Sequence, residues 1–509
     1  MSTLVDRVCA GIVALSWLCA AECAAGVVSS NERAGDLAYR ELRFAAALGL
    51  LDGPLPAHEP LSRAELRRLT AALPRGGANP RVARLGEYAQ AAASRPYPVV
   101  VAPHHRVETS LSSLRRSFAA PENLDYGSRR MEGALYEHDA LASVELDHVA
   151  LEWEGRLRLD RDDLAFRPLV VTARTQWRNL RVTLGREPLS WGPGVHGTLL
   201  LTTNARPFDQ IRFESERPFP FPLAPEWSDM HVSVFVARLD DPDRSDAPNP
   251  WMFGNRFALI PARWLVIGTT RTVMLGGDGF GFDWSVRNVA NLILAENENR
   301  FGGTMKNNSD QKLTFDVSLY LWPIAPRVPG LDGGRVYVEH GGDDGPRGFP
   351  PLPSATATCF GIELVSRGVL VRYERANNDD DGNLWYAHFL YVDGHTLRGR
   401  VMGHPMGGDT RAHAADVEIP CRSWGLATLG WEWEKHGYFA APGLFPGAVE
   451  GPVPTAVRQR FRVGLEMWRG GFPGALRVEG RFATERGDTA VYGPIERAGL
   501  SVEWRAPFR

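Results

Sequence analysis

Hydrophobic and polar residues alternate with a period of two in successive segments from Val99 to the end of the chain. In one such segment, Leu151, Trp153 and Leu157 alternate with Glu and Arg residues. This alternation predicts extended strands with one apolar face and one charged face. Stretches rich in Pro and Gly separate the segments at residues 240–251, 323–353, 377–382 and 437–454. The pattern therefore predicts a long all-β region without an intervening helix.

The residues that precede this region follow a helical pattern instead. Residues 31–51 are rich in Ala, Leu, Arg and Glu and stop at Asp52-Gly53-Pro54, which predicts a helix and its end. Ser62-Arg63-Ala64-Glu65 is a capping box, in which Ser and Glu satisfy exposed backbone donors where a helix starts. Residues 80–94 predict a third helix. We expect residues 26–98 to form a small helical plug or cap on the periplasmic side.

Residues 1–25 have the features of a secretory signal peptide, so we expect the mature chain to be exported. They contain an early Arg7, an apolar stretch, and small residues ending at Ala24-Ala25. After this signal, no apolar segment reaches the ~20 residues that a membrane helix needs. Any residence of the exported chain in a membrane must therefore rely on strands.

A soluble β-sandwich would show the same alternation, so further features are needed to choose between a sandwich and a membrane barrel. The signal peptide and the number of consecutive strands favour a barrel. The end of the chain agrees, because Arg497, Gly499, Val502 and Trp504 fit the pattern of terminal strands in outer-membrane barrels. At roughly 23 residues per strand and loop, residues 99–509 supply about 18 strands. We predict a large closed antiparallel transmembrane β-barrel, because closure leaves no unpaired edge in lipid.

The least generic stretch of the chain is residues 185–214. It contains a Trp191-Gly192-Pro193-Gly194 turn followed by Asn204-Ala205-Arg206-Pro207. Two further blocks follow, residues 255–279 and residues 386–405. In sequence and order these blocks resemble the Wzi family of capsule-assembly outer-membrane proteins. The resemblance implies a closed barrel in the Gram-negative outer membrane that anchors capsular or related exopolysaccharide in a lectin-like manner, without catalysing a reaction.

The same resemblance supplies candidate residues and partners. The expected partners are the polysaccharide and outer-membrane lipid, with the protein as a monomer. The net charge of -3 implies no attraction to nucleic acid. Whether the candidate residues bind polysaccharide or stabilise the barrel is left open. They are Trp191, Asn204, Arg206, Arg271 and Asp278.

Two other functions remain as alternatives. A charged inner face, with residues such as Glu152, Glu154 and Arg156, could line a channel for a charged solute, although cross-linking of the wall is the preferred interpretation. An outer-membrane hydrolase is the second alternative. It has little support, because the chain has no Gly-x-Ser-x-Gly elbow, no His-Glu-x-x-His motif and no Cys pairs at zinc spacing. We therefore expect no enzyme activity, no cofactor and no metal.

Three smaller features are also interpreted structurally. Residues 377–383 are similar to a calcium-binding loop but lack its terminal Glu, so a solvated hairpin tip is expected. Cys359 and Cys421 would remain after signal cleavage, and the sequence favours two free thiols over a disulfide between them. Most of the 15 Trp are expected in the belts at the two membrane interfaces, and the remainder could stack on sugars.

Overall fold

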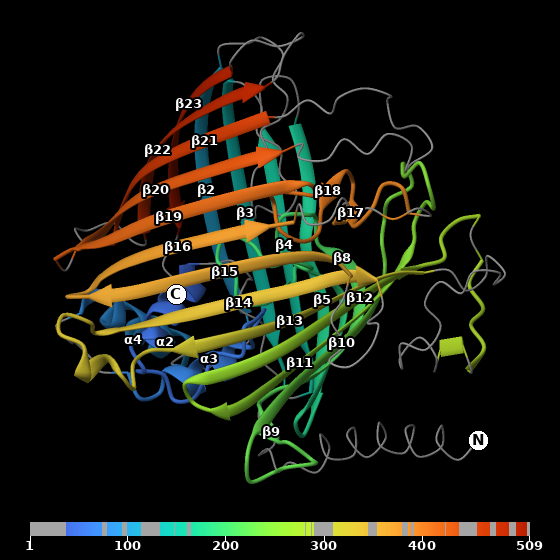
Figure 1. Ribbon diagram of the computed structural model, residues 1–509, viewed down its shortest axis with the longest axis horizontal. Coiled ribbons are helices and arrows are strands. Elements are labelled where there is room, and N and C mark those ends of the chain that lie inside the picture. The colour runs from blue at the N-terminus through green and yellow to red at the C-terminus, as the bar shows by residue number, and fades with distance from the viewer. Residues whose placement is uncertain are drawn as a thin grey trace.

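The protein is described here by a computed structural model. The residues described are 37–73, 79–93, 99–112, 133–146, 148–159, 164–279, 281–286, 288–289, 309–344, 354–378, 385–386, 388, 391–422, 424–436, 456–468, 475–487 and 495–505. The predicted signal peptide, residues 1–25, lies outside them. Figure 1 shows a sheet curved into a barrel, with helices at one end.

Long antiparallel strands build the wall of the barrel. In chain order they are β2 (Val99–Ser112), β3 (Gly133–Glu145), β4 (Ala150–Leu159), β5 (Leu164–Trp177), β6 (Leu180–Glu187), β8 (Phe208–Ser215), β10 (Asp229–Arg238), β11 (Trp251–Ala262), β12 (Leu265–Leu275), β13 (Ser309–Tyr320), β14 (Gly333–Asp344), β15 (Ser354–Ser366), β16 (Val369–Asn377), β19 (Thr410–Cys421), β20 (Gly425–His436), β21 (Ala456–Met467), β22 (Ala475–Gly487) and β23 (Ile495–Arg505). Each strand pairs with the next long strand, and β23 pairs with β2, which closes the sheet.

The number and direction of these strands match the sequence pattern. The short β9 (Phe219–Pro220) continues β8 along the same neighbour, β10. When β8 and β9 are counted as one, the described part of the wall has 18 strands. The predicted all-β antiparallel class is confirmed.

Hydrophobic side chains cover the outside of the wall. On β4, Leu151 and Trp153 are 46% and 39% exposed, whereas Glu152 and Glu154 beside them are 5% and 1% exposed. This arrangement is the reverse of a water-soluble fold, in which apolar side chains point inward. It fits a wall whose outer face meets hydrocarbon.

Charged side chains on the inner face pair across neighbouring strands, as the sequence analysis expected. Arg174 on β5 donates to Glu152 on β4 at 2.5 Å and also pairs with Glu187 on β6. On another part of the wall, Glu363 accepts from Arg335 and Arg372 at 2.7 Å each. Alternating signs give these buried charges close counter-charges, which offsets the cost of removing them from water. These rows of ion pairs therefore link adjacent strands on the lumen side of the wall.

Three helices fill one end of the barrel: α2 (Leu37–Ala47), α3 (Arg63–Thr70) and α4 (Pro80–Ala93). The expected cap of α3 is present, because the Ser62 hydroxyl accepts from the Glu65 backbone amide at 2.9 Å. The Glu65 side chain binds Arg68. The apolar faces of the helices pack against wall residues. These wall residues are Ala258, Ile260, Val266, Tyr320, Val365 and Leu370.

The helices lie at the end of the barrel that has the shorter turns. At this end β5–β6, β11–β12 and β15–β16 turn within two residues, 178–179, 263–264 and 367–368. Trp322 and Arg263, both in turns at this end, contact Gly49 and the Leu51 carbonyl of the helical region. Short turns are typical of the periplasmic end of outer-membrane barrels. Longer connections lie at the opposite end, as the strand order requires, and include 188–207, 239–250 and the described residues of 378–409.

Two of these long connections fold back into the lumen. Residues 188–207 are the first inward segment, and the described residues of 385–409 are the second. Leu199, Leu200 and Trp191 of the first form one buried apolar cluster with Tyr386 and Met402 of the second. The short β7 (Ser190–Trp191) also pairs with β1 (His58–Glu59) of the helical region. Helices and inward segments therefore form a continuous plug in the described part of the lumen.

The two cysteines of the predicted mature chain are not bonded to each other. Cys359 is buried on β15, where its Sγ lies 3.9 Å from the Gly197 carbonyl of the inward segment. Cys421 is partly exposed at the end of β19. The preference for two free thiols is confirmed.

Ion pairs attach the helices to the wall, so their loss should loosen the plug. Glu466 on β21 accepts from Arg40 at 3.0 Å and from Arg84 at 2.5 Å. Glu466→Gln should weaken this attachment, on the order of 3 kcal/mol for a largely buried pair. In detergent, trypsin should then cleave residues 37–93 at least several-fold faster than in the wild type.

The matched control is Asp316→Asn, which removes a buried wall carboxylate on β13 that pairs with Arg256 on β11. Because this pair contacts no helix, cleavage of residues 37–93 should stay close to the wild-type rate. Equal rates in the wild type and Glu466→Gln would show that the apolar packing alone fixes the helices.

Candidate functional site

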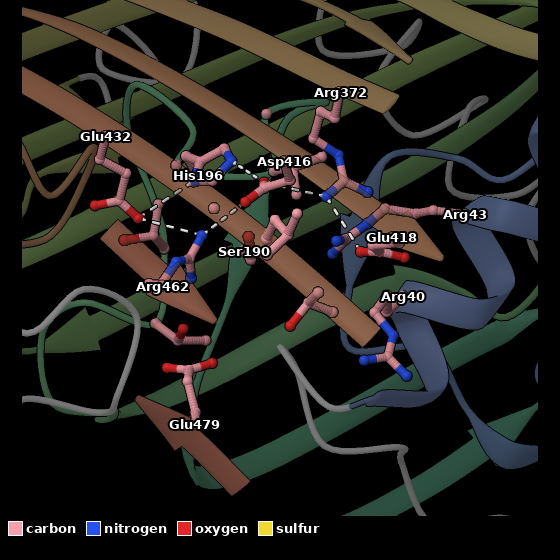
Figure 2. A pocket seen from close by; sticks show the side chains of 18 of the residues that line it. Arg40, Arg43, Ser190, His196, Arg372, Asp416, Glu418, Glu432, Arg462 and Glu479 are labelled. Carbon is pink, nitrogen blue, oxygen red and sulfur yellow. Dashed lines mark hydrogen bonds and ion pairs between the residues drawn. The ribbon is translucent and has the colours of Figure 1, made fainter. Parts of the chain in front are cut away.

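An inner cavity of about 260 Å³ lies between the helices, the first inward segment and the wall. Figure 2 shows Arg40 and Arg43 of α2 on one side and His196 of the inward segment opposite them. Side chains of β16, β19, β20, β21 and β22 complete the lining. The cavity is therefore enclosed by parts of the chain that are far apart in sequence.

The charges of the inner cavity largely satisfy one another. His196 Nε2 lies 2.6 Å from Asp416 Oδ2, and His196 Nδ1 lies 3.9 Å from Glu432. Arg462 bridges the same two carboxylates at 2.9 Å and 3.3 Å. Burial is the largest single influence and would lower the pKa of His196, but the nearby carboxylates of Asp416, Glu374 and Glu432 together outweigh it, and the pKa is raised above its ordinary value. This set of paired charges is suited to fixing the first inward segment to the wall.

Two wall glutamates hold the backbone of the same inward segment. Glu374 accepts from the amides of Val195 and His196 at 2.7 Å and 3.1 Å. Glu339 accepts from the amide of Leu199 at 3.1 Å. The acceptor oxygens belong to buried side chains on strands of the wall, so these hydrogen bonds fix the position of the backbone. The inward segment is therefore attached to the wall by its main chain as well as by its apolar side chains.

A second cavity, of about 570 Å³, lies at the end with the long connections. Its lining is strongly polar and comes from the start of β5 and from three connections, 188–207, 239–250 and 378–409. Arginine and aspartate predominate. The lining residues are Arg167, Arg206, Asp241, Asp243, Arg244, Asp393, Thr396, Arg398, Gly399 and Arg400.

Hydrogen bonds between connections make this outer cavity rigid. Arg244 donates to both oxygens of Asp246, at 2.8 Å and 2.9 Å, and its Nη1 and Nη2 also donate to the carbonyls of Thr396 and Gly394. Asp241 accepts from the amide of Arg398 at 2.7 Å. The bonds to Gly394, Thr396 and Arg398 join residues more than a hundred positions apart, so the cavity walls exist before any ligand arrives. Preorganised polar groups of this kind favour ligand binding.

The structure places the five candidate residues in different surroundings. Trp191 is fully buried against Phe235 in the plug, and Asn204 is buried with its amide donating to the Val401 carbonyl at 2.9 Å. Arg271 is buried on β12, where it binds Gln311. These three residues contact the interior of the protein.

The remaining two candidates lie nearer to solvent. Arg206 lines the outer cavity and is partly exposed. Asp278 is exposed and binds Arg238 and Asn249 at 2.7 Å each. Of the five candidates, only Arg206 lines the outer cavity.

Several residues of both cavities were not singled out from the sequence. His196, Glu374 and Asp416 gave no local signal, because each comes from a different element and looks like an ordinary residue of a strand or loop. Arg244 and Arg398 were equally inconspicuous. A usable signal was present in Asp240-Asp241-Pro242-Asp243-Arg244, where the density of charge is unusual for a connection between strands. Arg244 and Arg398 come together only because the connection 239–250 contacts the described part of 378–409.

Catalytic and metal chemistry gain no support from the described residues. No group of three or more His, Cys, Asp or Glu side chains that could hold a metal ion occurs among them. Most of the calcium-like stretch 377–383 lies outside the described part. Among the helices that the structure describes, none has both the length and the apolar character to cross a membrane.

A closed antiparallel wall, apolar outside and plugged by its own connections, defines a barrel of the type found in bacterial outer membranes. The chain belongs to the capsule assembly protein Wzi family, whose model matches residues 106–419. The resemblance read from the sequence blocks is confirmed. The matched range includes both inward segments and all residues that line the outer cavity.

A solved structure gives the same assignment of fold. The Escherichia coli protein Wzi, described as an outer membrane protein involved in group 1 capsule assembly and as a carbohydrate-binding β-barrel, aligns over 95% of this chain and 100% of its own. The TM-score is 0.67 at 17% sequence identity. Pseudomonas aeruginosa OccD3 (OpdP) and OccK2 (OpdF) align over 81% of this chain and 92% and 98% of theirs, each with a TM-score of 0.46, at 9% and 10% identity. No curated sequence matches the chain.

The raised pKa of His196 predicts a pH-dependent contribution to stability. Protonated His196 binds Asp416 in the folded protein. Because the folded pKa lies above the ordinary 6.5, the stabilisation is complete below about pH 6.5 and is lost as the pH rises through the raised value. His196→Gln should therefore lower the melting temperature of the detergent-solubilised protein by roughly 2–4 °C more at pH 5.5 than at pH 9.

His148→Gln is the control, since His148 lies in the exposed turn between β3 and β4. Its effect on the melting temperature should be small and the same at both pH values. A His196→Gln effect that does not change with pH would show that the imidazole stabilises the plug by packing rather than by charge.

Proposed function

We propose that this protein is an outer-membrane lectin-like barrel that anchors capsular or related exopolysaccharide to the cell surface. The observation that carries the proposal is membership of the capsule assembly protein Wzi family over residues 106–419. The Escherichia coli Wzi barrel, which shares the fold, is described as carbohydrate-binding and as involved in group 1 capsule assembly. Transfer of that role to this chain is our inference.

The architecture suits retention of a polymer better than its passage. The plug is bonded to the wall through Glu339 and Glu374, and the helices fill the opposite end. A rigid, filled barrel offers a stable surface at the end with the long connections, where the polar outer cavity lies. Held there by non-covalent contacts, the polysaccharide would stay at the cell surface without any bond being made or broken.

The outer apolar wall provides the membrane anchor for this role. Side chains such as Leu151, Phe166 and Leu184 are 46% to 58% exposed on the outside, where lipid would cover them. One chain closes the wall alone, so a monomer suffices for the function. Outer-membrane lipid and polysaccharide are the partners in this proposal.

The five residues singled out from the sequence take two roles in this proposal. We assign Trp191, Asn204 and Arg271 to support of the plug and wall, on the ground of their burial. Arg206 and Asp278 are the ones placed where a polysaccharide could reach them. Polysaccharide binding therefore depends first on Arg206.

Deletion of the gene tests the anchoring role. Cells that lack the protein should make the same total amount of surface polysaccharide, but most of it should appear in the culture medium. The measurement is uronic acid or total sugar in the cell and medium fractions, with plasmid-borne wild-type protein as the control. Unchanged retention on the deletion cells would refute anchoring while leaving the barrel assignment intact.

The alternative of a channel for a charged solute makes a different prediction. Because helices and inward segments occupy the lumen, purified protein in a planar bilayer should give no sustained single-channel conductance in 1 M KCl. A known open porin, reconstituted in the same way, is the control. Stable ion steps from the wild-type protein would favour the channel over the anchor.

The hydrolase alternative requires a nucleophile or carboxylate pair beside a His at one mouth of the barrel. In the described part, the closest arrangement is His196 with Asp416 and Glu432. These groups are paired with Arg372 and Arg462, and they lie between the helices and the inward segment rather than at a mouth. The protein is therefore proposed to act without catalysis.

A further inference from the structure

Arg206 differs from the other arginines whose contacts in the outer cavity are resolved. Arg244 is held by Asp246, and Arg398 pairs with Asp240 and Asp243 at 3.1 Å and 3.2 Å. The guanidinium of Arg206 makes no hydrogen bond or ion pair with any other residue in the described part of the chain. Arg206 is thus a partly buried cation in a preformed cavity, and its N–H groups are available to a ligand.

The surroundings of Arg206 make this position electrostatically unfavourable without an anion. Burial lowers the pKa of its guanidinium below the ordinary value, and the positive charges of Arg167 and Arg398 lower it further. Asp240 acts in the opposite direction but does not compensate. A cluster of like charges in a partly desolvated cavity costs free energy, and an anion bound there would recover it. Arginine forks bind carboxylates with two parallel hydrogen bonds.

The rest of the lining identifies what kind of anion would fit. Asp241, Asp243 and Asp393 line the same cavity, and carboxylates accept hydrogen bonds from hydroxyl groups. They would repel a small, densely charged anion but can bind a molecule that combines one anionic group with several hydroxyls. Acidic sugar residues have this combination. The volume of about 570 Å³ lies within the range of small-ligand cavities, roughly 300–1,000 Å³.

We propose that the outer cavity binds a carboxylate-bearing sugar residue of the polysaccharide, with Arg206 as the direct partner of the carboxylate. The aspartates around it receive the sugar hydroxyls. This assignment depends on the proposed anchoring function, and it narrows the ligand from polysaccharide in general to an acidic polymer. Arg206 is well placed for the role, because Pro207 follows it directly and the neighbouring Asn204 and Thr202 are bonded to the second inward segment.

The test compares binding of two polymers to the full-length protein in detergent. The first is the surface polysaccharide extracted from the source cells. The second is the same preparation after carbodiimide activation and borohydride reduction, which converts carboxylates to primary alcohols. Wild-type protein should bind the untreated polymer, and reduction should weaken binding at least tenfold. Binding of the untreated polymer should also weaken as salt is added, because ions screen exposed charges.

Variants connect this preference to the cavity. Arg206→Gln removes the charge and the fork, and should weaken binding of the untreated polymer by about tenfold to a hundredfold, the scale of charged hydrogen bonds. Arg206→Lys keeps the charge without the fork, and its affinity for the untreated polymer should lie between those of the wild type and Arg206→Gln. Arg375→Gln is the matched control, with the same loss of charge on the exposed outer face of β16. It should bind like the wild type.

The outcomes separate this inference from the function on which it rests. If wild-type protein binds the untreated and reduced polymers equally, or if Arg206→Gln binds the untreated polymer as tightly as Arg375→Gln, the acidic-sugar site is wrong and anchoring still stands. If wild-type protein binds neither preparation, the anchoring function itself is wrong. Melting curves of the variants verify that each is folded, so that weak binding by Arg206→Gln cannot come from unfolding.

Discussion

Pairing of buried charges inside the lumen is the condition on which the remaining structure depends. A barrel with lipid on its outside must turn its polar residues inward, and an unpaired charge there would be costly. Arg174 between Glu152 and Glu187, and Glu363 between Arg335 and Arg372, meet this condition along the wall. Because each charge is held by charges on adjacent strands, the same bonds that neutralise the lumen also fix the register of the strands.

The plug is an extension of the same network rather than a separate body. Wall carboxylates also bind the plug: Glu466 binds two helix arginines, Glu374 binds two backbone amides, and Asp416, which also pairs with wall arginines, binds His196. A filled barrel stabilised in this way has little freedom to open. Its functional surface is consequently the end with the long connections, where an arginine-rich cavity is built from segments that the plug holds in place.

Much of the fold could be predicted from the sequence because its signals are local. The alternation of Leu151 and Trp153 with Glu152 and Glu154 defines the two faces of a strand whatever its neighbours are, and the Ser62 cap marks a helix start within four residues. The outer cavity has no such signal. Arg206 could be chosen only through a family motif, and its neighbours Arg244 and Arg398 are separated from it and from each other by long stretches of chain.

The sequence by itself determined the class of the protein: strands with one apolar and one charged face, helices before them, and motifs that lead to the capsule assembly protein Wzi family. Only the tertiary structure decided that residues 188–207 and the described residues of 385–409 fold inward, that Trp191 supports the plug, and that Arg206 faces a cavity among other arginines. The reason is physical. Periodicity is set by the geometry of each strand alone, whereas burial and charge pairing depend on which distant segments meet.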